Sequence, residues 1–193
     1  MRTFITSITS MLVVICLGLS ACSTTPMTQS QKDEQRASVR EMADQTLAQL
    51  YQANPASRNA IRNSAGYAVF SNFGMKILFM GGAKGQGLAV NNATGQEIFM
   101  RMVELQPGLG LGAEKFRLIF VFDTPEAFNK FVTSGWEFGA NMMAAAKSKT
   151  EGGAFSGAVS VSPGVHLYQL SERGLIVGVS VTGAKYYRDD ELN

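Results

Sequence analysis

Residues 73–112 constrain the fold more than any other part of this chain, because glycines alternate there with short apolar runs. The stretch holds nine of the twenty glycines. Its apolar runs, such as residues 77–80 and 98–103, have the length of β-strands. A glycine between two such runs lets the backbone turn, or lets another backbone approach closely. The glycines expected at turns or close approaches are Gly81, Gly82, Gly85, Gly95 and Gly108.

Helical periodicity precedes this stretch. Apolar residues recur at steps of three and four from Val39 to Leu50, which predicts an amphipathic helix. Ser30 and Asp33 suggest a capping-box-like start, and Pro55 predicts an end by residue 54. The polar side of this helix mixes acidic and basic residues, whereas helices that lie on bilayers usually have a cationic face. We therefore favour packing against the sheet over contact with a bilayer.

Two shorter helices complete the helical part. Residues 56–64 predict the first, and residues 125–133 predict the second, which begins after Thr124 and stops at Gly135. The remaining pattern predicts strands, with a hairpin connection at residues 91–95. Residues 136–146 fit both helix and strand, and strand is chosen, whereas residues 147–153 have the composition of a loop. The predicted strands are 67–71, 75–80, 87–91, 96–105, 113–122, 136–146, 159–162, 166–171 and 175–186.

The predicted fold is therefore α+β. A mainly antiparallel, glycine-rich β-sheet carries the amphipathic helices at its amino-terminal side and one short helix near residues 125–133. The pattern leaves open whether the sheet closes into a barrel. A chain of 193 residues with 46% hydrophobic residues suits one domain with a real core.

The amino-terminal segment has the features of a secretory signal. Arg2 makes its start positive, residues 11–19 form an apolar core too short to span a membrane, and small residues precede Cys22. Residues 19–22, Leu-Ser-Ala-Cys, resemble the bacterial lipobox, in which the peptide is cut before a cysteine that receives acyl chains. We expect a signal peptide over residues 1–21 and lipidation of Cys22. The alternative is a plain signal peptide followed by an incidental cysteine.

Lipidation would decide where the protein resides. Cys16 leaves with the signal peptide and Cys22 carries lipid, so no thiol remains for disulfides, catalysis or metal binding. Acyl chains such as palmitate on Cys22 exceed what stable membrane anchoring requires. Ser23 resembles the residue that follows the cysteine in lipoproteins sent to the outer membrane. We expect a protein anchored to that membrane and facing the periplasm, with a tether over residues 22–30 and one domain over residues 31–193.

The sequence argues against several functions. A net charge of +2 without a basic block argues against nucleic acid. Residues 81–87 lack the Gly-Lys-Ser/Thr ending of a phosphate loop, so no nucleotide cofactor is expected. His166 is the one histidine, in a strand that predicts a half-exposed side chain, and no Gly-x-Ser-x-Gly motif accompanies it. The carboxylates, including that of Glu104, are scattered singly as on a solvated surface. We predict no enzyme and no metal site.

A binding surface remains as the main hypothesis. Lys84 lies between glycines that would leave backbone N–H groups accessible in a loop, and an ammonium beside such a nest suits an anionic head group. The residues predicted to contact a lipid head group are Lys84, Gly82, Gly85, Gly87, Lys115 and Arg117. Other basic residues spread over the sheet region are Lys76, Arg101, Lys130, Lys147, Lys149, Arg173 and Lys185. Any one of them can equally be an ordinary solubilising residue.

The order and spacing of several motifs resemble the SYLF domain family over about residues 56–188. The matching pieces are residues 65–70, 81–82 with 85–90, 108–112, 124–128 with Phe131, 138–140, and Tyr168 followed by 174–180. The resemblance implies a noncatalytic, lipid-associated domain, with phospholipid head groups as the ligands of eukaryotic members. The basic residue that often follows the double glycine is Ala83 here, with Lys84 one place later. An exported lipoprotein would not meet actin, so no actin partner is expected.

Three hypotheses of different classes follow. The leading one is a membrane-anchored, noncatalytic lipoprotein whose domain binds a phospholipid or another anionic amphiphile. The second is a structural or envelope-interaction protein that docks a protein or peptidoglycan through the exposed sheet. The third is a hydrolase that acts through His166.

Overall fold

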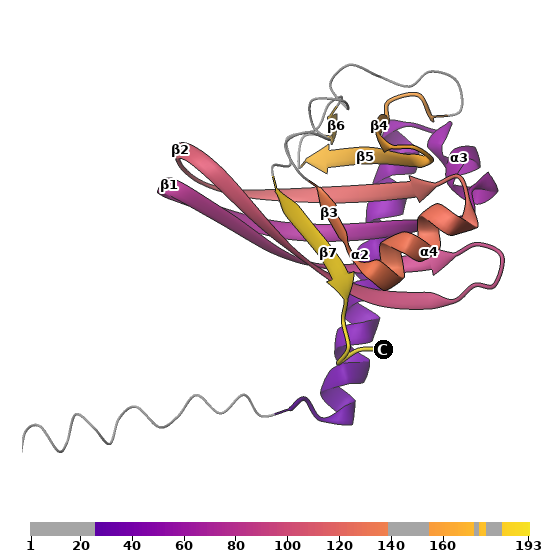
Figure 1. Cartoon of the computed structure of the whole chain (residues 1–193), viewed down its shortest axis with the longest axis horizontal. Helices are drawn as coiled ribbons and strands as arrows, with labels where there is room; N and C mark the ends of the chain where they lie inside the picture. Colours follow the sequence, from indigo (N-terminus) through magenta and orange to yellow (C-terminus); the bar gives the residue numbers. More distant parts are fainter. Residues whose placement is uncertain (1–25, 139–154, 172–173, 177–182) are drawn as a thin grey trace, which may run out of the picture.

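The computed structural model describes residues 26–138, 155–171, 174–176 and 183–193 (Figure 1). The described helices and strands form an α+β fold in which every strand pairing is antiparallel, so the predicted fold class is confirmed. The elements in chain order are α2 (Gln29–Ala53), α3 (Ser57–Asn63), β1 (Gly66–Asn91), β2 (Glu97–Phe122), α4 (Pro125–Ser134), β3 (Trp136–Phe138), β4 (Val159–Ser162), β5 (Val165–Ser171), β6 (Gly174–Ile176) and β7 (Ala184–Arg188).

The strands β1 and β2 form one long hairpin that dominates the sheet. Each strand has 26 residues, and their register runs from Gly66 opposite Phe122 to Val90 opposite Glu97. Gly95 lies in the connection with φ of 69°, as the predicted hairpin requires. Figure 1 shows the paired strands extending well beyond the rest of the sheet. The prediction of five separate strands here is wrong, because the pairing continues through residues 81–87 and 108–112.

Gly85 and Gly87 of β1 allow a close backbone contact rather than a turn. A methyl group placed on Gly85 would lie 2.7 Å from the carbonyl oxygen of Ser71, and one on Gly87 would lie 2.7 Å from that of Val69. The two halves of β1 therefore lie against each other, with a register irregularity between Leu78 and Met80. A side chain at Gly85 or Gly87 would prevent this approach.

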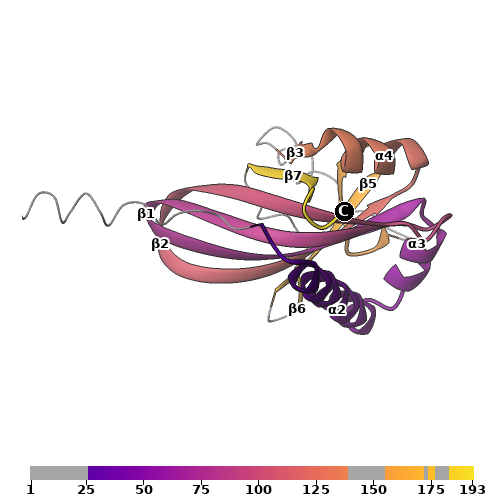
Figure 2. The ribbon, with the colours of Figure 1, turned by 90° about the horizontal axis from the view of Figure 1, so that it is seen from below.

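The sheet has two covered faces. Its strands follow the order β3-β7-β2-β5-β4, with β1 paired to β2 and β6 paired to β5. Figure 2 shows α2 and α3 on one side of the curled sheet and α4 on the other. Each side has its own cluster of buried hydrophobic residues. The long hairpin contributes to both clusters, so it is the layer on which the helices are placed.

Aromatic rings fill the face beneath α4. The helix begins after Thr124, whose side chain accepts a hydrogen bond from the backbone N–H of Ala127, and it ends at Gly135, as predicted. Phe131 is 1% exposed, and its ring centroid lies 5.3 Å from that of Phe120. The other rings of this cluster are Phe70, Phe122, Phe128, Trp136 and Tyr186.

The helix α2 packs on the opposite face through the predicted apolar stripe. Val39, Ala43 and Leu50 are at most 2% exposed, which confirms packing against the sheet. The predicted cap at Ser30 is wrong by two residues, because Thr28 is the residue that caps the helix. Its hydroxyl accepts a hydrogen bond from the N–H of Gln31, whose side chain in turn accepts from the N–H of Thr28. The helix thus begins within the segment predicted as tether.

Some predictions fall outside the described residues. Of the predicted strand 136–146 only β3 is described, and of the predicted strand 175–186 only the ends are described, in β6 and β7. The predicted loop at residues 147–153 and the lipidation residue Cys22 also lie outside. Within the described residues, no helix is both long and apolar enough to cross a bilayer.

Candidate functional site: a cationic groove beneath α2

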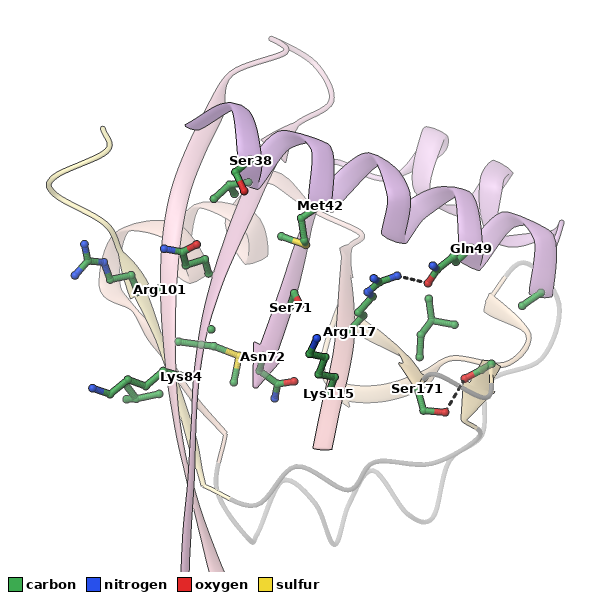
Figure 3. A pocket seen from close by; sticks show the side chains of 18 of the residues that line it. Ser38, Met42, Gln49, Ser71, Asn72, Lys84, Arg101, Lys115, Arg117 and Ser171 are labelled. Carbon is green, nitrogen blue, oxygen red and sulfur yellow. Dashed lines mark hydrogen bonds between the residues drawn. The ribbon is translucent and has the colours of Figure 1, made fainter. Parts of the chain in front are cut away.

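A groove of about 1390 Å³ separates part of α2 from the sheet (Figure 3). Both halves of β1 and both halves of β2 contribute to it, so it depends on the folded-back hairpin. Its lining residues are Ser38, Val39, Met42, Gln49, Gln52 and Ala53 from α2; Ser71, Asn72, Lys84, Gly85, Gln86, Arg101, Met102, Val103, Lys115 and Arg117 from the hairpin; and Leu170, Ser171, Gly174 and Tyr187 from the other strands.

Two rows of cross-strand neighbours form the floor. In one row Arg117 on β2 lies opposite Ser71 on β1 and opposite Leu170 on β5. In the other, Arg101 on β2 lies opposite Gln86 on β1 and opposite Tyr187 on β7. Side chains directly opposite on antiparallel strands share a face of the sheet, so each row presents one arginine to the groove.

Among the residues that the structure describes, four cationic side chains and no acidic one line the groove. The cations are those of Lys84, Arg101, Lys115 and Arg117. Because a partly enclosed site shields its charges less than open water does, this excess attracts anions to the groove. Its apolar lining comes mainly from Met42, Met102 and Leu170 and from other small apolar groups.

The carboxyl-terminal segment neutralises Arg101. The Nε of Arg101 lies 2.7 Å from Oδ2 of Asp189, and its Nη2 lies 2.7 Å from Oε2 of Glu191. The pKa of Arg101 is raised above its ordinary value mainly because its guanidinium donates a hydrogen bond to Asp189. The side chain of Asp189 is only 1% exposed, so this pair is part of the structure rather than a surface contact.

The other three cations pair with no carboxylate among the described residues. In the part of the chain that the structure describes, Lys84, Lys115 and Arg117 form no ion pair. Arg117 donates a hydrogen bond through Nη1 to Oε1 of Gln49 on α2. A neutral amide holds the guanidinium in place without cancelling its charge.

The structure brings together four of the six residues predicted to contact a head group. Lys84, Gly85, Lys115 and Arg117 all line the groove. Gly82 and Gly87 do not line it, and Gly87 instead receives the ring of Phe70, whose Cδ1 would lie 2.3 Å from an added methyl group. The roles of these residues in binding stay predictions.

The predicted loop around Lys84 is wrong. Lys84 belongs to β1 and lies opposite Val103 in the ladder with β2. Gly82 and Gly85 continue the strand on either side of it, so their N–H groups do not form the predicted nest. Lys84 is therefore a side-chain cation at the edge of the groove.

The histidine occupies a buried site on the α2 side of the sheet. His166 is 7% exposed rather than half-exposed, because the ring of Phe155 stacks on it with centroids 3.8 Å apart. Its Nε2 lies 2.9 Å from Oδ2 of Asp123, and its Nδ1 has no hydrogen-bond partner among the described residues. A hydrolytic relay needs that second nitrogen to face a hydroxyl nucleophile. The described residues thus hold no such relay through His166.

Other titratable residues also differ from their predicted surroundings. Glu104 is 2% exposed rather than solvated, and it accepts a hydrogen bond from Nδ2 of Asn72 at 3.1 Å. Within the described ranges, no group of three or more His, Cys, Asp or Glu side chains is placed to hold a metal ion.

The sequence did not single out Gln49, Ser71 and Leu170 as groove residues. Gln49 lies on the polar side of an ordinary amphipathic helix, and its partner Arg117 is 68 residues away. The spacing of Lys115 and Arg117 did carry a signal, since residues two apart on a strand share a face.

Comparisons with known proteins agree with the resemblance that the sequence motifs show. Residues 103–193 match the family model Ysc84, described as "Las17-binding protein actin regulator". The chain is also similar to Beta cell expansion factor A of Aeromonas veronii, with 29% identity over 160 residues. That match covers 82% of this chain and 59% of the relative, so the chain spans about three fifths of the relative's length. The match identifies a Ysc84 (SYLF) domain over residues 103–193, the same family that the glycine motifs of the chain resemble.

Proposed function

We infer that this protein is a noncatalytic lipoprotein whose SYLF domain binds the head groups of anionic phospholipids in the groove beneath α2. Acyl chains on Cys22 anchor it to the outer membrane, with the domain in the periplasm. Membership of the SYLF family fits a lipid-binding domain. The partners are the membrane and an anionic phospholipid or similar amphiphile, and neither nucleic acid nor actin is expected.

One observation carries the proposal: among the described residues the groove is lined by four cations, of which only Arg101 is neutralised by carboxylates, by several apolar groups and by no acidic side chain. Ligand sites typically combine an apolar wall with a few polar groups that fix orientation. The excess of positive charge selects for anions, and the apolar groups favour a ligand that also has a hydrocarbon part. An anionic phospholipid has both properties.

The distance from the proposed anchor to the groove is compatible with this function. Thr28 lies six positions after Cys22, and a fully extended chain of that length spans at most about 20 Å. Ser38, at the near end of the groove, is ten residues further along α2, or about 15 Å. The groove therefore lies within about 35 Å of the acylated residue. A domain held at this distance can reach head groups of the membrane that anchors it.

Vesicle flotation tests the lipid-binding part of the proposal. The mature chain from residue 22, with Cys22→Ala, keeps every contact described above because all of them involve residues 26–193. It is mixed with vesicles of phosphatidylcholine alone, or with one third phosphatidylglycerol or phosphatidic acid. We expect flotation with the anionic vesicles and little with phosphatidylcholine. No flotation with any vesicle would contradict lipid binding and leave docking of a protein or peptidoglycan as the next hypothesis.

A separate experiment tests the anchor. The full-length protein and its Cys22→Ser variant are expressed in a Gram-negative host with radiolabelled palmitate, and the membranes are fractionated. We expect label and outer-membrane location for the wild type, and neither for the variant. A labelled Cys22→Ser protein, or an unlabelled wild type, would disprove acylation at Cys22.

A further inference from the structure

We propose that Lys115 and Arg117 form a phosphate subsite in the groove, that this subsite prefers a phosphate monoester, and that Gln49 positions Arg117 for it. This inference deepens the proposed function and rests on it. All four cations line the groove, but the inference assigns ligand binding to only two of them, Lys115 and Arg117. The other two, Lys84 and Arg101, do not bind the ligand.

Arg101 is excluded from the phosphate subsite because two carboxylates already neutralise its charge. Its Nε and Nη2 are each 2.7 Å from a carboxylate oxygen, of Asp189 and Glu191 respectively. A ligand phosphate would have to displace a carboxylate that is almost fully buried. Breaking such a pair leaves a buried charge without compensation, which is strongly unfavourable.

Lys84 is excluded by its position. Figure 3 shows its ammonium group, like the guanidinium of Arg101, pointing away from the centre of the groove. The side chains of Lys84 and Lys115 are both exposed, so the direction of the Lys84 ammonium group, and not its exposure, is what excludes it. Lys84 can assist the approach of an anion, but it does not reach the space beneath α2.

Lys115 and Arg117 remain, and they lie side by side. They are two residues apart on β2 and both line the groove, and Figure 3 shows them in the space between the strands and α2. No carboxylate among the described residues pairs with either. Two adjacent cations repel each other, so a ligand that supplies two negative charges relieves the repulsion and gains both attractions.

Gln49 determines how the guanidinium of Arg117 is oriented in the groove. Gln49 on α2 accepts a hydrogen bond from Nη1, which fixes the guanidinium plane and leaves its remaining N–H groups for a ligand. A fixed guanidinium binds two phosphate oxygens at once, and Lys115 adds a point charge beside it. Gln49 is therefore a positioning residue that acts through Arg117.

This arrangement distinguishes phosphate esters. A phosphate monoester carries close to two negative charges above its second pKa of about 6, whereas a phosphodiester carries one. Because charge-assisted hydrogen bonds each change affinity by roughly tenfold or more, we expect the monoester to bind at least about tenfold more tightly. Phosphatidic acid has a monoester head group, and phosphatidylglycerol has a diester.

The test uses the mature Cys22→Ala chain and soluble ligands at pH 7.5. Isothermal titration calorimetry measures binding of dihexanoyl phosphatidic acid, dihexanoyl phosphatidylglycerol and inorganic phosphate. The variants are Arg117→Lys, Lys115→Gln and Gln49→Glu, in which the new carboxylate pairs with Arg117 and cancels its charge. Lys130→Gln, a lysine on α4 and so on the opposite face of the sheet, is the matched control, and Lys84→Gln tests the exclusion of Lys84.

The proposal expects three results together. The wild type binds phosphatidic acid about tenfold or more tightly than phosphatidylglycerol. Each of the three subsite variants loses most of that preference without a lower melting temperature, which a merely structural role for Gln49 would not produce. Lys130→Gln and Lys84→Gln keep it.

The failures are distinguishable. If the wild type binds both lipids equally, or if Gln49→Glu keeps the preference, the subsite is wrong while lipid binding stands. If the wild type binds neither the soluble lipids nor anionic vesicles, the proposed function fails. Inorganic phosphate bound as tightly as phosphatidic acid would support the phosphate subsite and contradict a lipid as its source.

Discussion

Replacing Gly87 by alanine tests the folding back of β1, on which the groove depends. The added methyl group would lie 2.3 Å from Cδ1 of Phe70 and 2.7 Å from the carbonyl oxygen of Val69. Phe70 cannot rotate away easily, because it is fully buried among the aromatic rings beneath α4. The carbonyl oxygen belongs to the backbone of the same strand and cannot move without displacing the ladder with β2.

The loss of folding free energy expected for Gly87→Ala follows from the close packing around Gly87. Forcing an extra methyl group into a close-packed interior usually costs about 1–3 kcal/mol. Gly82→Ala is the matched control, since its nearest neighbour beyond the adjacent residues would be the carbonyl oxygen of Glu104 at 3.4 Å, an ordinary contact. An alanine in a strand interior is favoured over glycine by roughly 0.5–1 kcal/mol. We therefore expect opposite signs for two glycines five residues apart.

Urea unfolding of the mature Cys22→Ala chain measures both changes. The single tryptophan, Trp136, lies in the aromatic cluster and reports on unfolding through its fluorescence. With a slope of about 2 kcal/mol per molar urea, Gly87→Ala should lower the midpoint by roughly 0.5–1.5 M. Gly82→Ala should raise it slightly. Equal midpoints for Gly87→Ala and the wild type would show that the two halves of β1 do not approach each other as described.

Three further changes test the cores and the helix cap. Phe131→Ala should lower the free energy of unfolding by about 3–5 kcal/mol, because the ring is 1% exposed; a loss below 1 kcal/mol in urea unfolding would contradict its place in the core. Thr28→Ala should cost about 1 kcal/mol through the lost capping box, and an unchanged melting temperature would refute that cap. Burial raises the pKa of Tyr168 to about 12 from 10, so the unfolded chain loses its proton first and stability should fall as pH rises from 10 to 12. Tyr168→Phe should reduce that fall and cost little at pH 7, since the hydroxyl has no hydrogen-bond partner among the described residues; an equally steep fall in urea unfolding would refute this assignment.

The helices were predictable because their signals are local. Thr124, Pro125 and Gly135 each act within one turn of α4, so reading them requires no knowledge of the rest of the fold. The start of α2 was misplaced because Thr28 with Gln31 and Ser30 with Asp33 offer the same cap pattern two residues apart. Only the hydrogen bonds of the folded chain distinguish them.

The hairpin was harder to predict because a glycine has two uses. Gly85 and Gly87 have the spacing expected of a turn, yet they allow one half of β1 to lie against the other. Which use applies depends on residues 66–71, which lie far along the strand. Local composition therefore predicted strands of the right kind but interrupted them wrongly.

The groove residues, too, were predictable only where the signal lies in neighbouring residues of the sequence. Lys115 and Arg117 could be placed on one face of a strand from their spacing alone. That Arg101 is neutralised depends on Asp189, 88 residues later, and that Arg117 is held by Gln49 depends on how α2 lies across the sheet. Neither pairing can be predicted from the residues next to Arg101 or Arg117 in the sequence.

Native mass spectrometry of the protein, purified from its own host in mild detergent, tests the central claim most directly. We predict a complex with one copurified anionic phospholipid, lost when Lys115 and Arg117 are both changed to glutamine and retained when Lys130 is changed. A wild-type protein without any bound amphiphile, or a double variant that keeps the same lipid, would contradict the assignment of the groove as a head-group site.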